Sequence, residues 1–463
     1  MENDMKIRRF FSLFFCCVLF LQLTAPALAA QDDVGDWEIA AKAALLIDPD
    51  TEEILYARNI HERLYPASLT KIMTCLLVLE AIDSGKLTRE TVLTASEAAV
   101  TSIPPDGSNA GIKVGEELTV DSLLYCIMLS SANEGCNILA EAVSGSIDGF
   151  VEQMNQKAAA LGCTDTHFVN TNGLPDSNHY TTAWDLYLIT KEARTHPDFM
   201  PLVGTIFYEV PATNLSDPRK LYTTNYLISS YRTSGYIYKG AEGIKTGSTS
   251  AAGYCLVASA SRSGRSLLSV VLGAERITLE DGTILTQSFS ETIKLYDWGF
   301  DSFSRQVILR ADELVGEVPV TLSQEQNTVK VHPAQEIERL LPKDIDLTRD
   351  ISRIITRSEE SVEAPVTKGQ VLGQITLSSG DTVYAQVDLL ADEDVSASRL
   401  LVFRRDLLAF LHRPALWICV GSAAAAVALL LGLRAFLRAR RRRYRKVSSR
   451  GRRTSSGYRG RRR

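Results

Sequence analysis

The sequence predicts an α/β protein of the α+β kind, in which helices flank an antiparallel sheet and a smaller β-rich domain follows. Strand-like runs lie near both ends of the first 300 residues, at about 42–48, 53–58, Gly253–Ala260 and Ser266–Gly273. Turn signals separate the members of each pair, namely Asp48-Pro49-Asp50 and Ser263-Gly264, as in antiparallel hairpins. Apolar helical runs occupy the sequence between the pairs, so helices are expected on the faces of the sheet.

The length of 463 residues allows two or more domains. The first is expected over residues 36–300. The second is expected over residues 305–395, where short Val, Ile, Leu and Thr runs are broken by Lys368-Gly369 and Ser379-Gly380-Asp381. Short strands between turn residues predict a small β domain.

The N-terminus has the pattern of a secretory signal peptide, predicted over residues 1–29. Lys6, Arg8 and Arg9 precede an apolar run from Phe10 to Leu23, and Ala27-Leu28-Ala29 fits a cleavage site. The mature chain is therefore expected outside the cytoplasm.

A second apolar segment, residues 415–433, contains 19 residues without a charge. As a helix it would be about 28 Å long, close to the roughly 30 Å hydrocarbon core of a bilayer. The alternative is a buried helix of a soluble domain. An Arg-rich tail, residues 434–463, follows on one side only, which favours a single-pass transmembrane helix with this tail in the cytoplasm.

The net charge of −5 hides a strong asymmetry. Residues 434–463 carry 15 basic and no acidic side chains, whereas residues 31–433 carry 32 basic and 53 acidic ones, a net charge of −21. A basic tail can bind nucleic acid, but beside a membrane span attraction to anionic lipids is the simpler interpretation. No nucleic-acid partner is expected.

Five cysteines lie between the two apolar segments: Cys75, Cys126, Cys136, Cys163 and Cys255. Because their number is odd, at least one is free or pairs between chains. Cys75 and Cys126 lie in apolar helical runs and are predicted to be buried thiols. There is no C-x-x-C motif and the six histidines are scattered, so neither a metal site nor a cofactor is expected.

The first chemical motif is Ser68-Leu69-Thr70-Lys71. It follows Pro66, which suits the first turn of a helix, and the apolar run from Ala67 to Ile82 predicts that this helix is buried. Residues three apart share a helix face, so Lys71 is expected beside Ser68. A buried lysine loses its charge more readily and can activate a serine hydroxyl. An unrelated serine and lysine at a helix start is the alternative.

The second motif, Ser131-Ala132-Asn133, lies between the apolar run Leu123 to Leu129 and a helix-like stretch from Glu134 to Val143. Its side chains can relay a proton and bind a peptide backbone. The alternative is a helix N-cap, a common role for serine and asparagine.

The third motif, Lys245-Thr246-Gly247, ends an extended segment that begins at Gly243. Gly247 allows a ligand backbone to approach the strand closely. Lys245 offers a positive charge and Thr246 a hydroxyl, both suited to a carboxylate. A basic edge strand with a turn glycine is the alternative.

In this order the motifs form the S-x-x-K, S-x-N, K-T-G set of enzymes that acylate a serine with a D-amino-acid peptide or a β-lactam. The chain resembles the D-alanyl-D-alanine carboxypeptidases, which are low-molecular-mass penicillin-binding proteins. The resemblance is strong over about residues 38–300 and weaker to about 395. It extends to these segments: 43–48, 65–68, 111–120, 170–174, 180–185, 242–249 and 252–254.

The resemblance implies the transpeptidase and β-lactamase architecture and a catalytic set of three residues. Ser68 would attack the carbonyl between the last two D-alanines of a peptidoglycan stem pentapeptide. Lys71 would take its proton, and Ser131 would help to pass a proton to the leaving D-alanine. Water would then hydrolyse the acyl-enzyme, and β-lactams would act as inhibitors.

The resemblance also implies substrate-binding residues. Asn133 would bind the substrate backbone, Lys245 would support the serine relay electrostatically, and Thr246 would contact the terminal carboxylate. The backbone N–H groups of Ser68 and Ser248 would form the oxyanion hole, and Gly247 would keep the strand open to the substrate.

Two positions depart from the family pattern. Glu134 stands where many relatives have aspartate. Relatives often place an arginine after the third motif to hold the carboxylate, and the nearest candidate is Arg276, which is followed by the acidic residues Glu280 and Asp281. A solvated surface arginine is the alternative for Arg276.

Three other functions remain open. A serine β-lactamase has the same motifs, but the type with a water-activating glutamate finds no such residue in Asn170–Leu174. A D,D-endopeptidase would use the same chemistry on cross-links. A non-catalytic wall-binding protein is disfavoured because every motif residue is intact.

Overall fold

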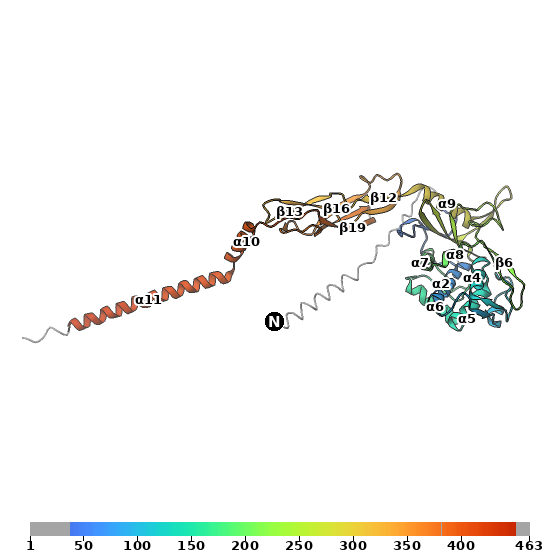
Figure 1. Cartoon of the computed structure of the whole chain (residues 1–463), viewed down its shortest axis with the longest axis horizontal. Helices are drawn as coiled ribbons and strands as arrows, with labels where there is room; N and C mark the ends of the chain where they lie inside the picture. Colours follow the sequence, from blue (N-terminus) through green and yellow to red (C-terminus); the bar gives the residue numbers. More distant parts are fainter. Residues whose placement is uncertain (1–37, 381, 451–463) are drawn as a thin grey trace, which may run out of the picture. The chain divides into compact units, whose positions relative to one another are not determined.

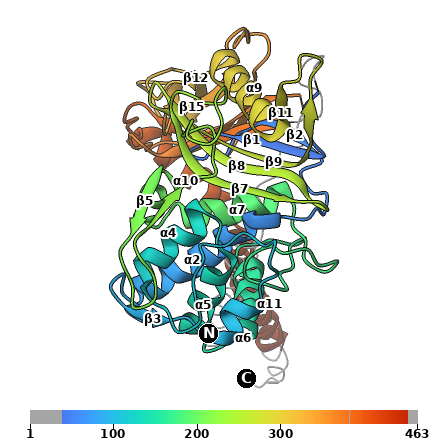
Figure 2. The same cartoon turned by 90° about the vertical axis from the view of Figure 1, so that its right-hand side faces the viewer.

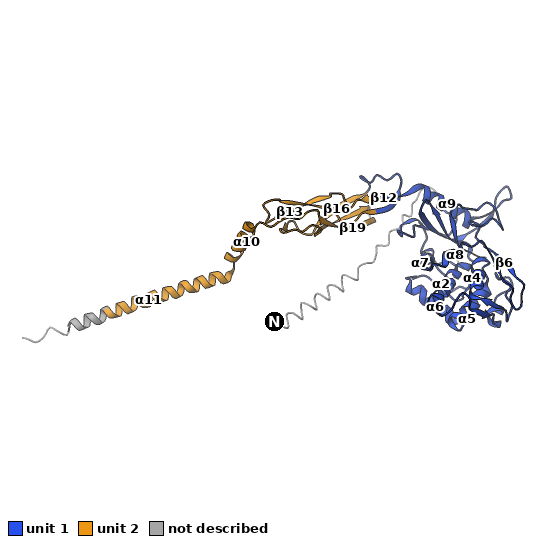
Figure 3. Ribbon diagram, in the orientation of Figure 1, with its two compact units in different colours: residues 1–307, 338–350 blue, residues 308–337, 351–463 orange. Residues whose placement is uncertain are grey.

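The computed structural model describes residues 38–380 and 382–450. The chain divides into two compact units (Figure 3): the first runs to residue 307 and includes residues 338–350, and the second contains residues 308–337 and the chain from 351 onward. Residues 338–350 thus leave the contiguous second domain expected over 305–395 and join the first unit. The predicted signal peptide and the end of the basic tail, residues 451–463, lie outside the described residues.

A five-stranded antiparallel sheet organises the first unit, in the order β2-β1-β9-β8-β7. Its strands are β1 (Ala43–Ile47), β2 (Ile54–Arg58), β7 (Ala241–Thr249), β8 (Gly253–Arg262) and β9 (Arg265–Ala274). The predicted strand pairs and the antiparallel ribbon are confirmed. Since β7 pairs only with β8, its other edge is open among the described strands.

The helices of the first unit lie between β2 and β7 in the sequence, apart from the last one. They are η1 (Ala67–Thr70, a 3-10 turn), α2 (Lys71–Asp83), α3 (Glu97–Thr101), α4 (Val120–Leu129), α5 (Asn133–Ser144), α6 (Ile147–Ala160), α7 (Ala183–Ala193), α8 (Phe199–Val203) and α9 (Gln287–Ser302). Three two-stranded sheets complete the unit: β3 (Val92–Thr94) with β4 (Glu117–Thr119), β5 (Phe207–Val210) with β6 (Arg219–Tyr222), and β10 (Arg276–Thr278) with β11 (Ile284–Thr286).

Each face of the sheet has its own hydrophobic core. In β1, Ala43, Leu45 and Ile47 belong to one core, whereas Ala44 and Leu46 belong to the other, as the period of two in a strand requires. Helices α2, α4, α5 and α7 contribute to the first core and α9 to the second, and Figure 2 shows them on opposite sides of the sheet. This confirms the predicted layers of helix, sheet and helix.

The second unit is built on a six-stranded sheet in the order β16-β18-β19-β14-β13-β17 (Figure 1). Its strands are β13 (Gly316–Thr321), β14 (Thr328–Pro333), β16 (Ser352–Arg357), β17 (Val362–Glu363), β18 (Val371–Ser379) and β19 (Thr382–Ala391). The strands β12 (Phe303–Leu309) and β15 (Ile337–Pro342) pair with each other in a separate two-stranded sheet, and most residues of both belong to the first unit. A β-rich domain in this part of the chain is therefore confirmed.

Two helices follow the second sheet, α10 (Arg399–Leu411) and α11 (Pro414–Arg450). Within α11, the segment Pro414–Arg441 is long and apolar enough to cross a membrane, and it is the one such helix in the described part of the chain. It contains the predicted span 415–433. None of its apolar window is buried, so the alternative of a buried core helix is wrong.

Candidate active site

The three motifs meet around the side chain of Lys71. Its Nζ lies 3.0 Å from Ser68 Oγ in the first motif and 2.7 Å from Asn133 Oδ1 in the second. The third motif packs against the first through its backbone, because a Cβ added to Gly247 would lie 3.1 Å from Ser68 N and 3.0 Å from Pro66 O. A side chain at this position would therefore crowd the backbone of the Ser68 turn.

Ser68 lies in the 3-10 turn η1, and the regular helix α2 begins only at Lys71. The sequence predicts a helix from Ala67, whereas in the structure the first turn is a 3-10 turn and the α-helix follows it. Side chains at i and i+3 eclipse in a 3-10 helix, which places Lys71 directly over Ser68. The predicted burial of α2 is confirmed, since nearly all its residues from Lys71 to Ala81 are buried.

A buried histidine supports this turn. The N–H of Val169 donates to His179 Nδ1 at 3.1 Å, so the ring proton is on Nε2, which donates to Thr70 Oγ1 at 2.8 Å. The Thr70 hydroxyl in turn donates to the carbonyl of Ala67 at 2.9 Å. Burial lowers the pKa of His179 to about 4, so the ring stays neutral and this chain of hydrogen bonds persists at neutral pH.

Gly173 packs against the same turn, and we expect Gly173→Ala to destabilise the protein. Gly173 has φ +91°, and a Cβ there would lie 1.8 Å from the carbonyl oxygen of Ala67. Strain and overlap together should lower the free energy of unfolding by at least about 2 kcal/mol. Chemical denaturation measures this loss.

Gly85→Ala provides the matched control for that substitution. Gly85 has φ +74° with nothing within 4 Å of its Cβ position, so it reports the conformational cost alone, about 1 kcal/mol. Equal losses in the two variants would show that the contact between Gly173 and Ala67 is unimportant.

Lys71 is fully buried and has an acceptor for each of its three protons. Besides Ser68 Oγ and Asn133 Oδ1, the carbonyl of Asn172 accepts from Nζ at 2.8 Å. Burial lowers the pKa of Lys71 to about 8. When Nζ loses a proton, the amide and carbonyl oxygens can only accept, so they hold the two remaining N–H groups. The lone pair is then left for Ser68, the one partner that can donate.

A second buried lysine lies nearby in the third motif. Lys245 is 1 % exposed, and its Nζ donates to the carbonyl of Thr246 at 3.2 Å. Burial, and then the positive charge of Lys71, lower the pKa of Lys245 to about 7. Two ammonium groups in one dry site repel each other, so losing the proton from either one is favoured.

Ser131 contributes a buried hydroxyl with no hydrogen-bond partner in the described part of the chain. Its backbone has φ +61°, a conformation that L-residues other than glycine, asparagine and aspartate seldom adopt. An unpaired buried hydroxyl is costly, and such groups call for an explanation. A hydroxyl held ready for a ligand is one.

Asn133 is the first residue of α5, and the helix-cap alternative for the second motif is wrong. The N-cap is Ala132, which makes no side-chain cap. The Asn133 side chain instead accepts from Lys71, and its backbone N–H donates to the carbonyl of Ser108 at 2.9 Å. Glu134, the departure from the family pattern, accepts from the backbone N–H of Ala110 at 2.7 Å.

The remaining residues of the third motif lie along the open edge of β7. The hydroxyl of Thr246 is 2.6 Å from that of Thr224, and Ser248 is exposed. An open strand edge offers main-chain hydrogen bonds to an extended peptide. The main-chain groups on the open edge of β7 therefore lie beside Ser68.

Arg276 lies outside this set of contacts. It is an exposed residue at the start of β10, where it pairs with Thr286, and in the described structure its side chain has no hydrogen bond to a motif residue. It does follow β9 closely, and Ala274 of β9 lies opposite Tyr254, which lies opposite Ser248. Arg276 therefore comes directly after the end of β9 that lies across β8 from Ser248. Its role in binding the substrate carboxylate stays a prediction.

Three contacting groups were not singled out from the sequence: the carbonyl of Asn172, the His179 ring and the Thr224 hydroxyl. Asn172 lies in the segment 170–174, which resembles the family, and this resemblance is the feature of the sequence that could have pointed to it. The five cysteines in the described part of the first unit are free and buried, which confirms the prediction for Cys75 and Cys126.

Comparison with known proteins agrees with this geometry. Residues 27–276 match the family model described as D-alanyl-D-alanine carboxypeptidase, and residues 303–397 match the C-terminal domain of penicillin-binding protein 5. The D-alanyl-D-alanine carboxypeptidase DacF of Bacillus subtilis (strain 168) is 32% identical over 399 residues, which cover 86% of this chain and 97% of that protein. DacC of Escherichia coli (strain K12), another D-alanyl-D-alanine carboxypeptidase, is 30% identical over 81% of this chain and 90% of its own length.

A solved structure gives the same result. Penicillin-binding protein 5 from Haemophilus influenzae has a TM-score of 0.59 at 29% identity and covers 79% of this chain and 100% of its own. The chain therefore belongs to the D-alanyl-D-alanine carboxypeptidase family of penicillin-binding proteins and is a serine-type hydrolase.

Proposed function

We propose that this enzyme removes the terminal D-alanine from peptidoglycan stem pentapeptides through an acyl-enzyme on Ser68. The observation that carries the proposal is the set of three acceptors around Lys71 Nζ, one of which is Ser68 Oγ at 3.0 Å. Two of them cannot donate a hydrogen bond, so a neutral Lys71 directs its lone pair to the serine. Ser68 then loses its proton to Lys71 as its Oγ bonds to the scissile carbonyl carbon.

Collapse of the tetrahedral intermediate requires a proton on the leaving amine of D-alanine. The hydroxyl of Ser131 is buried without a partner in the described residues, so it can pass its proton to that amine while it takes the proton that Lys71 received from Ser68, which leaves both groups as they began. A positive charge on Lys245 would support this proton transfer by Ser131 electrostatically. Water then attacks the acyl carbonyl and frees Ser68.

Charge that develops on the substrate oxygen needs fixed donors. We assign the oxyanion hole to the N–H groups of Ser68 and Ser248, which lie on either side of the close contact at Gly247. Asn133 would bind the substrate backbone, and Thr246 and Arg276 would bind its carboxylate. A β-lactam carries a comparable carboxylate and acylates the same serine.

Turnover of the β-lactam acyl-enzyme should be slow. In the described residues, no carboxylate hydrogen-bonds to Ser68 or Lys71, and Glu134, whose charge acts on Lys71, is held by the backbone N–H of Ala110. This favours a penicillin-binding peptidase over a β-lactamase.

We further propose that α11 spans the membrane with the catalytic unit outside and the basic tail in the cytoplasm. The apolar segment Pro414–Arg441 supports the span. The 15 basic residues of 434–463 support the orientation, and anionic lipid head groups are their expected contact.

The proposal is tested with the purified protein in detergent. We expect release of D-alanine from a pentapeptide ending in D-Ala-D-Ala, measured by a coupled D-amino-acid assay, and a stable penicillin adduct that peptide mass mapping places on Ser68. Steady turnover of the β-lactam would favour a β-lactamase instead. An adduct without D-alanine release, but with cleavage of cross-linked dimers, would favour an endopeptidase.

A further inference from the structure

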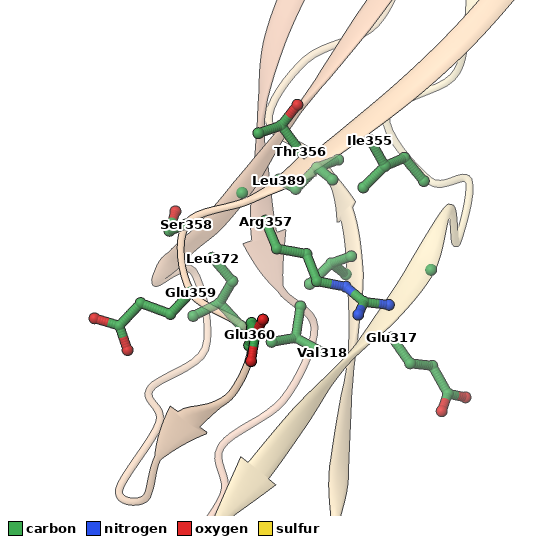
Figure 4. A pocket seen from close by; sticks show the side chains of 13 residues that line it. Glu317, Val318, Ile355, Thr356, Arg357, Ser358, Glu359, Glu360, Leu372 and Leu389 are labelled. Atoms are coloured by element: carbon green, nitrogen blue, oxygen red, sulfur yellow. The ribbon is translucent and has the colours of Figure 1, made fainter.

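The six-stranded sheet of the second unit leaves an open groove of about 840 Å³ between two of its strands. Figure 4 shows this groove, with Glu317 and Val318 of β13 on one side and Ile355, Thr356 and Arg357 of β16 on the other. The two sides face each other, since Ile355 Cδ1 lies 3.8 Å from the Cβ position at Gly316. The groove lies wholly within the second unit and is unrelated to the motif residues.

Both strands that border the groove have unpaired edges in the described structure. β16 is the first strand of the sheet and pairs only with β18. On β13, the short strand β17 covers only Val320 and Thr321, which leaves Gly316–Pro319 without a neighbour on that side. Unpaired edges are ready to bind another strand, and here two of them border one groove.

The strand β16 presents one apolar side chain to the groove. All six of its residues are exposed. Successive side chains of a strand point to opposite faces, and of the two isoleucines it is Ile355, 42% exposed, that lines the groove. Ile355 lies opposite Ile375 of β18, which is buried. Arg353 and Arg357 of the same strand provide the charge that usually protects an edge strand from pairing with a copy of itself.

The groove has an apolar floor and an acidic rim. Val318, Leu372 and Leu389 line it and are nearly fully buried, so apolar side chains of a guest strand would find apolar surface. The rim carries Glu317, Glu359, Glu360 and Arg357. None of these four forms an ion pair within the described residues, which leaves a net charge of −2 for a guest to neutralise.

A second copy of the chain is a poor guest. If two β16 strands paired antiparallel about Ile355, Arg353 of each would lie opposite Arg357 of the other, and like charges directly opposite destabilise a sheet. Arg353 is also held by Glu313, whose Oε1 lies 2.6 Å from its Nη1. The charges therefore disfavour self-pairing.

We propose that this groove binds an extended segment of a partner protein in which apolar and basic residues alternate. The segment adds a strand to the free edge of β16, alongside the groove. Its apolar side chains face Val318, Leu372 and Leu389, and its basic side chains face outward to Glu317 and the Glu359–Glu360 loop. Main-chain bonds supply affinity, and the alternating side chains supply selectivity.

The test uses the full chain in detergent and two fluorescein-labelled heptapeptides, one alternating lysine with valine and one alternating glutamate with valine. We expect the lysine peptide to bind in an anisotropy titration and the glutamate peptide not to bind. Hydrogen exchange should slow at the amides of residues 352–357 when the lysine peptide is bound, because free edge N–H groups become paired.

Charge reversal on the rim is the matched variant. The double substitution Glu317→Lys with Glu360→Lys should weaken binding of the lysine peptide by at least about tenfold. Glu325→Lys, at another exposed position in the same unit, should leave it unchanged, and unaltered hydrogen exchange of β18 and β19 in all variants confirms that the second unit is folded. Equal binding of both peptides, or exchange protection outside β13 and β16, would overturn the proposal.

Discussion

Replacing Ser68 by alanine is expected to abolish both D-alanine release and covalent labelling by penicillin. Each reaction needs a bond from Ser68 Oγ to the carbonyl carbon, and the alanine methyl group cannot form it. Loss of a serine nucleophile lowers kcat by a factor on the order of 10⁴ to 10⁶. Rates of D-alanine release and in-gel fluorescence of a penicillin conjugate measure the two losses.

The fold should survive this change, because within the described structure the Ser68 hydroxyl has one hydrogen bond, which it accepts from Lys71. Ser84→Ala, which removes a hydroxyl at the opposite end of α2 that donates to Ala81, should retain full activity and labelling. If the Ser68→Ala protein still became covalently labelled, the nucleophile would be another residue. One that binds penicillin reversibly without a covalent adduct would agree with the proposal.

The sheet could be predicted from the sequence because local patterns decide it. The run from Ala43 to Ile47 is apolar at every position, and turn residues bound each of the predicted strand pairs. A strand buried on both faces needs this composition. Its place beside β9, more than 200 residues later in the chain, followed from the resemblance to a family and not from the pattern.

The motif residues could be predicted because their chemistry is carried by side chains of fixed type. The contact at Asn172 could not, since a backbone carbonyl leaves no mark in the residue identity. His179 hydrogen-bonds to Thr70, which in turn hydrogen-bonds to the carbonyl of Ala67. Residues 70 and 179 are far apart in the sequence, so this contact depends on the tertiary fold. The return of residues 338–350 to the first unit depends on long-range contacts such as the 2.7 Å bond from Leu340 N–H to Glu53.

Replacing Lys71 by methionine is expected to reduce the acylation rate by a factor on the order of 10³ to 10⁵, close to the loss in Ser68→Ala, because members of a catalytic unit fail together. Methionine fills a similar volume, but it leaves the oxygens of Asn133 and Asn172 without their donor. In D-alanine release, the double variant with Ser68→Ala should be no slower than Ser68→Ala alone. Stopped-flow measurement of penicillin acylation gives the rates.

The pH dependence of the wild type separates a base from a merely structural lysine. Burial lowers the pKa of Lys71 to about 8, so the neutral, active form increases as the pH rises, and acylation should accelerate through pH 8 and level off about one unit above that pKa. The pKa of Lys245 is lowered to about 7, so Lys245 loses its charge earlier in the same rise, and this loss should raise KM for a carboxylate-bearing substrate. Because the two lysines interact, the measured values belong to the pair.

Lys157→Met provides the control for the loss of a lysine. Lys157 is paired with Glu80 and Glu192 away from the motifs, and its replacement should leave both the acylation rate and the pH profile unchanged. The residual acylation of Lys71→Met should rise with pH only as hydroxide does, without the plateau that the wild type reaches above pH 8, because no internal base remains. A mutant that kept the wild-type plateau at a reduced rate would show that Lys71 only positions Ser68, and the base would then have to be sought at Lys245.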